Sequence, residues 1–518
     1  MKIKILMLGA ITVLLGTSCN LNEQLYGSKI LASSTSSSSN LAGVYSSLNG
    51  FATQSNTYAL QEHSTDEMMG PTRGTDWGDF GTWRKLHTHT WDASYQQISD
   101  TWDFLNTGSY LASQVIANTT NNQIKAEASF IRAYYMFQIT DLFGQVPMRD
   151  PNASPDAIPT VLKRSDAVNQ IITDLTFAEA NLGPASGVNQ ASKAAAEALL
   201  AKVYLNKAVY TASAPSTTYT FDPGDMTKVV NYCNAVQANG GYQLAPAGSY
   251  YANFDWNNQT GSTEIIFGLT NTTTQAPASP RFTWMMGTHY LQTTGGWNGF
   301  TTLAAFYNSF DPKDERLGGA YPGLTDKTGL RAGFLIGQQY GPINKSGTPY
   351  VAGPLPQRNG SPLIYTPDVN LNFSTEAQGI RVIKYLPHPT TTDGFIGESN
   401  YSNTYILLRY ADVRLMKAEA LSRGGTDSQG ETALSIINDI RTRRGIAPLS
   451  TIATADILTE RGHELFYEGW RRNDQIRFGT FNAPVDQRPQ ASALTYQVYA
   501  IPQRAIDTNP NLKQNAGY

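Results

Sequence analysis

The sequence predicts a mainly α-helical protein whose two helical parts are separated by a long irregular region. Apolar residues recur at helical spacing from about residue 41 to 240, and again from 401 to 518. Between 241 and 400 the composition changes to glycine, proline, threonine and aromatic residues, with only short runs of strand character. We therefore expect a helical scaffold with helix pairs of the tetratricopeptide type, which carries a loop-rich region with short strands.

The start of the chain has the character of a leader. Lys2 and Lys4 precede an apolar run of about 12 residues, and small residues then lead into Cys19. This run is shorter than the ~20 residues that a membrane-spanning helix needs. We interpret residues 1–18 as a lipoprotein signal peptide and Cys19 as the lipid-attachment residue; the alternative is a secretory signal followed by an incidental cysteine. The serine-rich residues 19–40 are expected to tether the lipid to the folded part.

Six amphipathic segments are expected in the first helical part, residues 41–240. They are 41–52, 94–117, 123–143, 165–181, 190–210 and 225–239. Cys233 lies in the last of these segments, and we interpret it as a buried small apolar residue rather than a nucleophile. If Cys19 carries lipid, the mature monomer has no second cysteine with which Cys233 could form a disulfide.

The central region, residues 241–400, is expected to consist mostly of loops. Its clearest strand-like runs are Glu264–Leu269 and Gly379–Leu386. Long irregular segments on a rigid scaffold are the usual place for binding residues. Ligand contacts are therefore expected to concentrate in this region.

The second helical part, residues 401–518, contains three expected helices, 404–423, 431–444 and 454–468. The middle one has Leu434 and Ile437 on its apolar face. Gly445 stands where a C-terminal capping glycine is favoured, and Pro448 prevents continuation.

Three glutamates in the last expected helix recur every four residues, at Glu460, Glu464 and Glu468. A helix would place them along one face, within reach of three arginines, Arg461, Arg471 and Arg472. We interpret this face as salt bridges that fix the helix against a neighbour. Acid or base chemistry is the alternative.

The composition favours a neutral, polar ligand. The formal net charge is −3 and the isoelectric point is near 6.1, so the chain lacks the positive charge typical of nucleic-acid binding. Only 15% of the residues are charged, whereas 11% are aromatic, and small polar residues are frequent in the expected loops.

Common enzyme motifs are missing or incomplete in the sequence. His463 and Glu464 begin like a zinc-protease HExxH helix, but Tyr467 occupies the position of the second histidine. His87 and His89 could hold a metal, yet no third ligand is identifiable. The triplet 79–81 matches the kinase DFG motif without its companion motifs, so we interpret it as a coincidence. A pair of carboxylates for glycoside hydrolysis stays open, because their spacing is spatial.

Two glycine-rich segments with large aromatic residues are the predicted ligand site. Sugars present apolar C–H faces ringed by hydroxyls, and so favour flat aromatic platforms beside fixed hydrogen-bonding groups. Trp77 and Trp297 are the leading pair. The full candidate set is Arg73, Asp76, Trp77, Trp83, Trp284, Tyr290, Trp297 and Asn298. The alternative is that these rings only wedge loops onto the scaffold. Trp102 and Trp470 are expected in the core, and Trp91 and Trp256 are also interpreted as structural.

The segment Thr459–Phe481, TERGHELFYEGWRRNDQIRFGTF, resembles the C-terminal signature of the SusD/RagB family. Further blocks resemble the same family in the same order: Ala126–Met148, Ala191–Ala208, Phe310–Gly319, Tyr405–Gly425, Ala433–Leu449 and Asn509–Tyr518. Any one of them would be a weak match, but together they cover nearly the whole mature chain.

The resemblance implies a SusD-like helical scaffold with four tetratricopeptide-like units and a non-catalytic function. It implies a lipoprotein of the bacterial outer membrane, facing the cell surface, that binds an oligo- or polysaccharide. The implied partner is a SusC-like TonB-dependent transporter, to which the glycan is delivered. A peptide or another nutrient is the first alternative ligand, and a lipid-anchored glycoside hydrolase is the second. No cofactor is implied, and a structural ion in the loops stays open.

Overall fold

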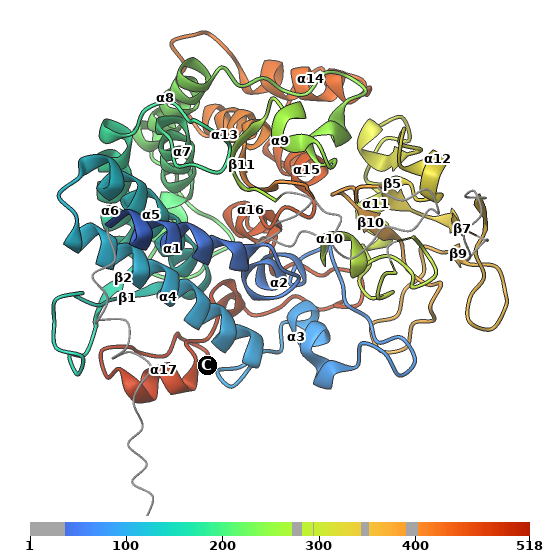
Figure 1. Cartoon of the computed structure of the whole chain (residues 1–518), viewed down its shortest axis with the longest axis horizontal. Helices are drawn as coiled ribbons and strands as arrows, with labels where there is room; N and C mark the ends of the chain where they lie inside the picture. Colours follow the sequence, from blue (N-terminus) through green and yellow to red (C-terminus); the bar gives the residue numbers. More distant parts are fainter. Residues whose placement is uncertain (1–36, 272–281, 294, 343–351, 390–401) are drawn as a thin grey trace, which may run out of the picture.

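The computed structural model describes residues 37–271, 282–293, 295–342, 352–389 and 402–518. The predicted signal peptide and Cys19 lie outside these residues. Figure 1 shows two sides: helices α4 to α8 gather on one, and most of the short strands lie on the other. The predicted mainly helical fold with short strands in a loop-rich region is confirmed.

The helices are α1 (Ser37–Ser47), α2 (Asn56–Glu62), α3 (Thr82–Thr88), α4 (Gln96–Asn118), α5 (Asn122–Phe143), α6 (Arg164–Asn181), α7 (Lys193–Tyr210), α8 (Pro223–Gly240), α9 (Asn258–Gly261), α10 (Phe282–Met285), α11 (Ala304–Asn308), α12 (Thr325–Thr328), α13 (Tyr410–Ser422), α14 (Ala433–Arg443), α15 (Thr454–Leu465), α16 (Arg471–Arg477) and α17 (Gln503–Thr508). The strands are β1 (Gln145–Met148), β2 (Thr160–Lys163), β3 (Ile265–Leu269), β4 (Gly318–Gly319), β5 (Ala332–Leu335), β6 (Gly337–Gln338), β7 (Tyr340–Pro342), β8 (Ala352–Pro354), β9 (Ile364–Tyr365), β10 (Arg381–Ile383) and β11 (Tyr405–Arg409).

Consecutive helices from α4 to α8 pack against each other, and α8 packs in turn against α13. Local sequence marks where these helices begin. The side chains of Asn121, Ser192 and Asp222 each accept a hydrogen bond from a backbone N–H in the first turn of α5, α7 and α8. Gly108 lets α4 approach α5 closely, because a Cβ there would lie 2.1 Å from Cζ of Tyr135. The result is a stack of helix pairs.

The helix expected over 404–423 is wrong at its start. Residues Tyr405–Arg409 form strand β11, which pairs antiparallel with β3, and α13 begins only at Tyr410. All five residues of β11 are buried. A short run that is buried on every side has no polar face, so periodicity cannot distinguish a strand from a helix there. The β3–β11 pair joins the second helical part to the central region.

The strands of the central region are short and antiparallel. β10, β5 and β4 form a three-stranded sheet, and β6 pairs with β9 as β7 does with β8. The strand expected over 379–386 is therefore reduced to the three residues of β10. Loops form most of the rest of this region.

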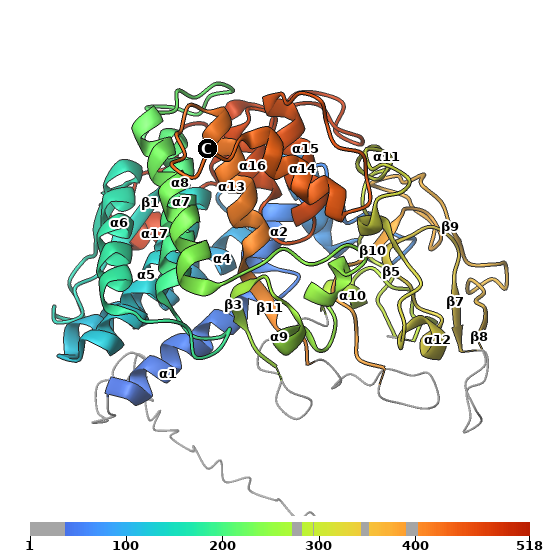
Figure 2. The same cartoon turned by 90° about the horizontal axis from the view of Figure 1, so that it is seen from above.

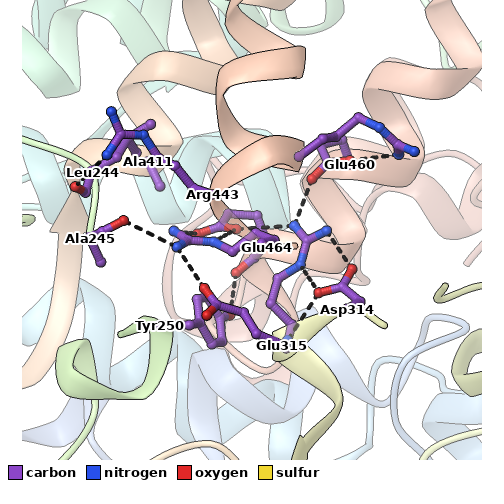
Figure 3. Close-up of polar contacts among 12 residues, drawn as sticks. Leu244, Ala245, Tyr250, Asp314, Glu315, Ala411, Arg443, Glu460 and Glu464 are labelled. Carbon is purple, nitrogen blue, oxygen red and sulfur yellow. Dashed lines mark hydrogen bonds and ion pairs between the residues drawn. The ribbon is translucent and has the colours of Figure 1, made fainter. Parts of the chain in front are cut away.

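A buried ionic cluster joins α15 to the central region and to the preceding helix. The Glu464 carboxylate accepts hydrogen bonds from Arg409 at 2.9 Å and from Arg316 and Arg444 at 3.1 Å. Figure 3 shows Glu464 beside Glu460, Glu315 and Asp314 in this cluster. The three arginines hold the pKa of Glu464 far below its usual range, although burial opposes them. The prediction of structural salt bridges is thus supported by geometry.

The predicted partners of these glutamates are wrong, because the helix ends early. α15 ends at Leu465, so Glu468 lies in the turn beyond it and meets Arg409 and Lys384. The three arginines expected on this face pair elsewhere: Arg461 with Asp412 and Asp474, Arg471 with Asp66, and Arg472 with Asp141. Because these acids lie far apart in the sequence, no local spacing could identify them.

The C-terminal residues return to the N-terminal helices. Figure 1 shows α17 close to α4 and to the β1–β2 hairpin, and α16 close to α2. The N–H groups of Tyr467 and Gly469 donate to the buried carboxylates of Glu67 and Glu62. At the end of the chain, Trp91 Nε1 donates to the hydroxyl of Tyr518 at 2.7 Å. The first and last parts of the chain therefore form one core.

We expect Glu464→Gln to lower the free energy of unfolding by about 3–5 kcal/mol, because removing a buried carboxylate leaves its arginines without a matching charge. Arg443→Ala is the control: its ion pair with Asp439 is partly exposed, and its loss should cost less than ~1 kcal/mol. Denaturant unfolding followed by circular dichroism measures both. Equal stability of the two variants would show that the cluster is not essential to the fold.

Candidate functional site

Three segments that are distant in sequence meet where the predicted site residues lie. Isolated backbone bridges join Met69 to Thr301 and Arg73 to Ser374, and a third joins Thr302 to Ile380. The segments around residues 69–83, 282–302 and 366–381 are thereby held side by side. Figures 1 and 2 place α10, which starts the second segment, between the helices and the strands of the central region.

Trp77 and Trp297, the leading predicted pair, lie next to each other. Trp77 Nε1 donates a hydrogen bond of 2.9 Å to the carbonyl oxygen of Trp297. The ring centroids are 6.4 Å apart, with an angle of 45° between the planes. The Trp77 ring also packs on the Phe300 ring, with 4.8 Å between the two centroids. Both tryptophans are partly buried, so each is anchored in the protein and presents the remainder of its surface to solvent.

Trp83, Trp284 and Asn298, also in the predicted set, are buried. Trp83 packs on Phe300 and donates from Nε1 to the carboxylate of Asp79 at 2.7 Å. Trp284 is only 2% exposed. The side-chain oxygen of Asn298 accepts a hydrogen bond of 3.1 Å from Arg381. These three residues support the loops from below, and a ligand could reach them only after the loops rearranged.

Arg73 and Arg381 are buried arginines that hold loop carbonyls. Arg73 donates to the carbonyl oxygens of Gly299, Thr375 and Gln378 at 2.6–2.8 Å. Arg381 also donates to the carbonyl of Gln378, at 2.7 Å. Burial lowers the pKa of both guanidinium groups, and their mutual repulsion lowers the pKa of Arg73 further. Arg73 thus fixes all three segments, rather than presenting its charge at the surface.

A polar rim, formed by Asp76, Tyr290, Arg358 and Glu376, lies beside the tryptophans. The Tyr290 hydroxyl and the Arg358 backbone N–H both donate to the carboxylate of Glu376. The guanidinium of Arg358 lies over the Tyr290 ring, 4.1 Å from its centroid, and 3.3 Å from the carboxylate of Asp76. Arg358 and Asp76 are more than half exposed. They could therefore hydrogen-bond to a ligand that rests on the aromatic rings.

His289 donates to the same carboxylate as a neutral group. The backbone N–H of Leu291 donates to His289 Nδ1, so the proton of the neutral ring is on Nε2, which lies 3.3 Å from Glu376. Burial is the largest cause that lowers the pKa of His289 to about 4. Glu376 therefore accepts hydrogen bonds from three groups of the protein. This arrangement fixes the rim and does not resemble a free catalytic acid or base.

The backbone around the site is strained and closely packed. Trp77 and Asn298 have φ angles of +59° and +52°, a left-handed conformation that costs non-glycine residues about 1–2 kcal/mol each. Asp79 and Phe80 share this conformation. Gly299 is required for close approach, because a Cβ there would lie 2.3 Å from the Trp77 ring. Such strain clusters at functional sites, where the surrounding structure holds it in place.

The residues of this surface that sequence reasoning missed include Glu376, Phe80, Arg358 and Phe373. Phe80 stands in a glycine-rich loop, so the rule that selected Trp77 would have selected it too, but the triplet was explained away as a chance DFG motif. Phe373 follows Asn372 in a segment without glycine. Arg358 carries no comparable signal, since only the fold brings it to Asp76 and Tyr290.

His87, His89 and Cys233 have structural surroundings. The two residues of the predicted HxH pair are buried, and each donates from a ring nitrogen to a backbone carbonyl oxygen: His87 to Asp486 and His89 to Ser64. Cys233 is buried, as expected, and Trp91, Trp102 and Trp470 are buried too. Within the described ranges, no group of three potential ligand side chains is arranged to hold a metal. No helix among these residues has the length and apolar character needed to span a membrane.

Comparison with protein families gives a match for nearly the whole chain. The model described as the SusD family matches residues 196–518. This chain belongs to the SusD family. A second model, described as starch-binding and associating with the outer membrane, matches residues 28–205. Members of the SusD family are non-catalytic binding proteins associated with the outer membrane, so the alternative of a lipid-anchored hydrolase is set aside.

Individual relatives within the SusD family are distant in sequence but similar over nearly their full length. The starch-binding protein SusD of Bacteroides thetaiotaomicron is 25% identical over 89% of this chain and 85% of its own. A SusD superfamily protein from Parabacteroides distasonis has the same fold, with a TM-score of 0.71 at 19% identity over 93% of this chain and all of its own. A laminarin-binding SusD-like protein gives a TM-score of 0.67 at 20% identity, over 93% of this chain and 99% of its own.

We expect Gly299→Ala to displace Trp77 and to lower the free energy of unfolding by about 1–3 kcal/mol, because the added methyl overlaps both the Trp77 ring and the carbonyl oxygen of Met286. Gly78→Ala is the matched control in the neighbouring loop. Gly78 has a helical φ of −65° and nothing within 4 Å of its would-be Cβ. A stability change within about 0.5 kcal/mol is expected for it. Denaturation and tryptophan fluorescence measure the two effects, and identical behaviour of the variants would contradict the packing argument.

Proposed function

We propose that this protein is a non-catalytic surface lipoprotein that binds an oligo- or polysaccharide on the aromatic face of Trp77 and Trp297, beside Tyr290. The observation that carries the proposal is the pairing of partly exposed tryptophans with a rim of exposed charged groups. The rings offer flat apolar surfaces for the C–H faces of a sugar. Asp76 and Arg358 offer a carboxylate and a guanidinium to its hydroxyls.

The rigidity of the face supports binding rather than chemistry. Arg73 and Arg381 fix the loops from beneath, and Glu376 holds Tyr290 in place. A preformed site loses little conformational entropy when a ligand binds. The names of relatives point the same way, since they include a starch-binding and a laminarin-binding protein. The identity of the glycan in this chain is not implied by those names.

A peptide is the alternative ligand. Extended peptides are often recognised through sheet edges or through charged contacts. At this face, the exposed charges of Asp76 and Arg358 pair with each other, which favours an uncharged ligand. The binding test below separates the two ligand classes.

The second part of the proposal concerns location and delivery. Lipid on Cys19 anchors the protein to the outer membrane, facing the cell surface, and the bound glycan is passed to a SusC-like TonB-dependent transporter. The leader sequence and membership of the SusD family support this part. Many anchored copies would raise the local concentration of a weakly bound glycan.

Trp77→Ala and Trp297→Ala are each expected to weaken glycan binding by about tenfold or more, because each removes a stacking surface. Affinity electrophoresis through starch, laminarin, xyloglucan, yeast mannan and mucin, with reducing ends assayed in parallel, identifies the polymer and detects any hydrolysis. Titration calorimetry then measures the variants. Ile158→Ala is the control, because it removes an exposed apolar side chain next to β2, on the helical side of the molecule.

Retardation by one or more polymers without release of reducing ends is the expected result. Failure of every polymer to bind the wild type would overturn the glycan proposal and favour a peptide. Unchanged affinity in both tryptophan variants would show that the glycan binds elsewhere.

Cys19→Ser is expected to release the protein from the membrane fraction while glycan affinity stays unchanged, because the cysteine carries only the anchor. Membrane fractionation and immunoblotting measure release, and affinity electrophoresis of the released protein measures binding. Persistent membrane association of the variant would contradict the lipoprotein assignment.

A further inference from the structure

Phe80 is the most exposed large apolar side chain among the described residues. Its accessible area is 104% of the reference value, and Phe373 follows with 83%. A ring in that position contributes no stabilisation through burial, and its apolar surface stays in unfavourable contact with water. Single exposed apolar residues are common on protein surfaces, so exposure alone does not indicate a role.

The backbone of Phe80 gives a second, independent reason to expect a role. Phe80 has φ +52° and ψ +24°, a left-handed conformation that is unfavourable for a bulky residue. Asp79 is left-handed as well, at +35°, and so is Gly81, at +81°. Glycine occupies three other positions of this loop, at 74, 78 and 81. At position 80 the chain has a phenylalanine where glycine would fold more easily, and its ring is not buried in return.

Phe80 lies on the same loop as Trp77, one of the two tryptophans of the aromatic face. It lies three residues after Trp77, and Asp79 before it accepts the indole hydrogen bond of Trp83. Its loop is tied to the loop of Phe373 through Thr72. The Thr72 hydroxyl accepts from Arg84 at the start of α3, and its backbone pairs with Leu371 and Ser374. The two most exposed rings of the described chain therefore lie on adjoining loops beside the proposed glycan site.

We propose that Phe80 is a further sugar-stacking platform, which extends the site of Trp77 and Trp297 so that longer oligosaccharides bind more tightly than short ones. This inference rests on the proposed function. A short glycan would occupy the tryptophans alone, whereas a longer one would continue onto the Phe80 ring.

A glycan fits this position better than a protein surface does. Apart from Phe373, the residues near Phe80 are mainly polar: Asp79 precedes it, and Asn370 and Asn372 lie in the adjoining loop. A protein partner would favour a continuous apolar patch, with the ring at its centre. A sugar instead needs one flat ring surrounded by hydrogen-bonding groups.

Phe80→Gly is the decisive variant, because glycine removes the ring and adopts a positive φ without strain. Phe80→Tyr is the matched variant that keeps an aromatic platform. The probes are oligosaccharides of increasing length, from the disaccharide upward, prepared from whichever polymer of the panel retards the wild type. Calorimetry gives the affinity of each length, and thermal unfolding gives the melting temperature of each variant.

The expected result for Phe80→Gly is an unchanged affinity for the shortest bound oligosaccharide and an affinity about fivefold to tenfold lower for the longest. Its melting temperature should be equal to or above that of the wild type, and Phe80→Tyr should behave as the wild type at every length. Equal affinity of wild type and Phe80→Gly for the longest chain would overturn the inference while leaving the proposed function intact. Loss of binding at every length, or a lowered melting temperature, would overturn it in favour of a structural role. No binding of any polymer to the wild type would overturn the inference and the proposed function together.

Discussion

The fold depends on the pairing of buried charges around Glu464. One carboxylate receives arginines from the central region, from the end of β11 and from the end of α14. A buried arginine without an acid is costly, so these three parts of the chain are stable only when they meet at α15. Hydrophobic burial supplies most of the stability of such a protein, but it is not directional. The ion pairs therefore determine which face of the loop-rich region contacts the helices.

The loops of the proposed binding face are held by buried arginines that bind carbonyl oxygens rather than acids. Arg73 donates to backbone carbonyl oxygens of two segments far from it in sequence. Arg381 donates to carbonyl oxygens close to it in sequence and reaches the distant Asn298 through that residue's side-chain oxygen. Carbonyl groups belong to every residue, so side chains in these loops can change without loss of the support beneath them. This arrangement suits a binding face, since the aromatic side chains above can change while the backbone that supports them is kept. The strained backbone of Trp77 and Asn298 is held by the same supports.

The sequence predicted long helices well and spatial partners poorly. The helices from α4 to α8 were expected within three residues at each end, because amphipathic periodicity and capping residues are local signals. Strand β11 was mistaken for helix, because burial on every side removes the periodic signal. The partners of Arg461, Arg471 and Arg472 could not be predicted, since acids from several elements converge on them. At the site, residue type and glycine-rich context pointed to Trp77 and Trp297, which the structure brings together. The exposure of Phe80 and the burial of Trp284 depend instead on how the loops fold.

The contacts between the C-terminal residues and the first helices delay the folding of the N-terminal part of the chain. The carboxylates of Glu62 and Glu67 accept hydrogen bonds from the backbone N–H groups of Gly469 and Tyr467, and the Trp91 indole donates to the hydroxyl of Tyr518. Contacts of such long sequence separation close slowly, because loop-closure entropy is lost before they form. During synthesis Glu62 and Glu67 therefore lack these partners until residues 467–469 have been made. Truncation before residue 467 would therefore leave the first helices without these partners and open to proteolysis.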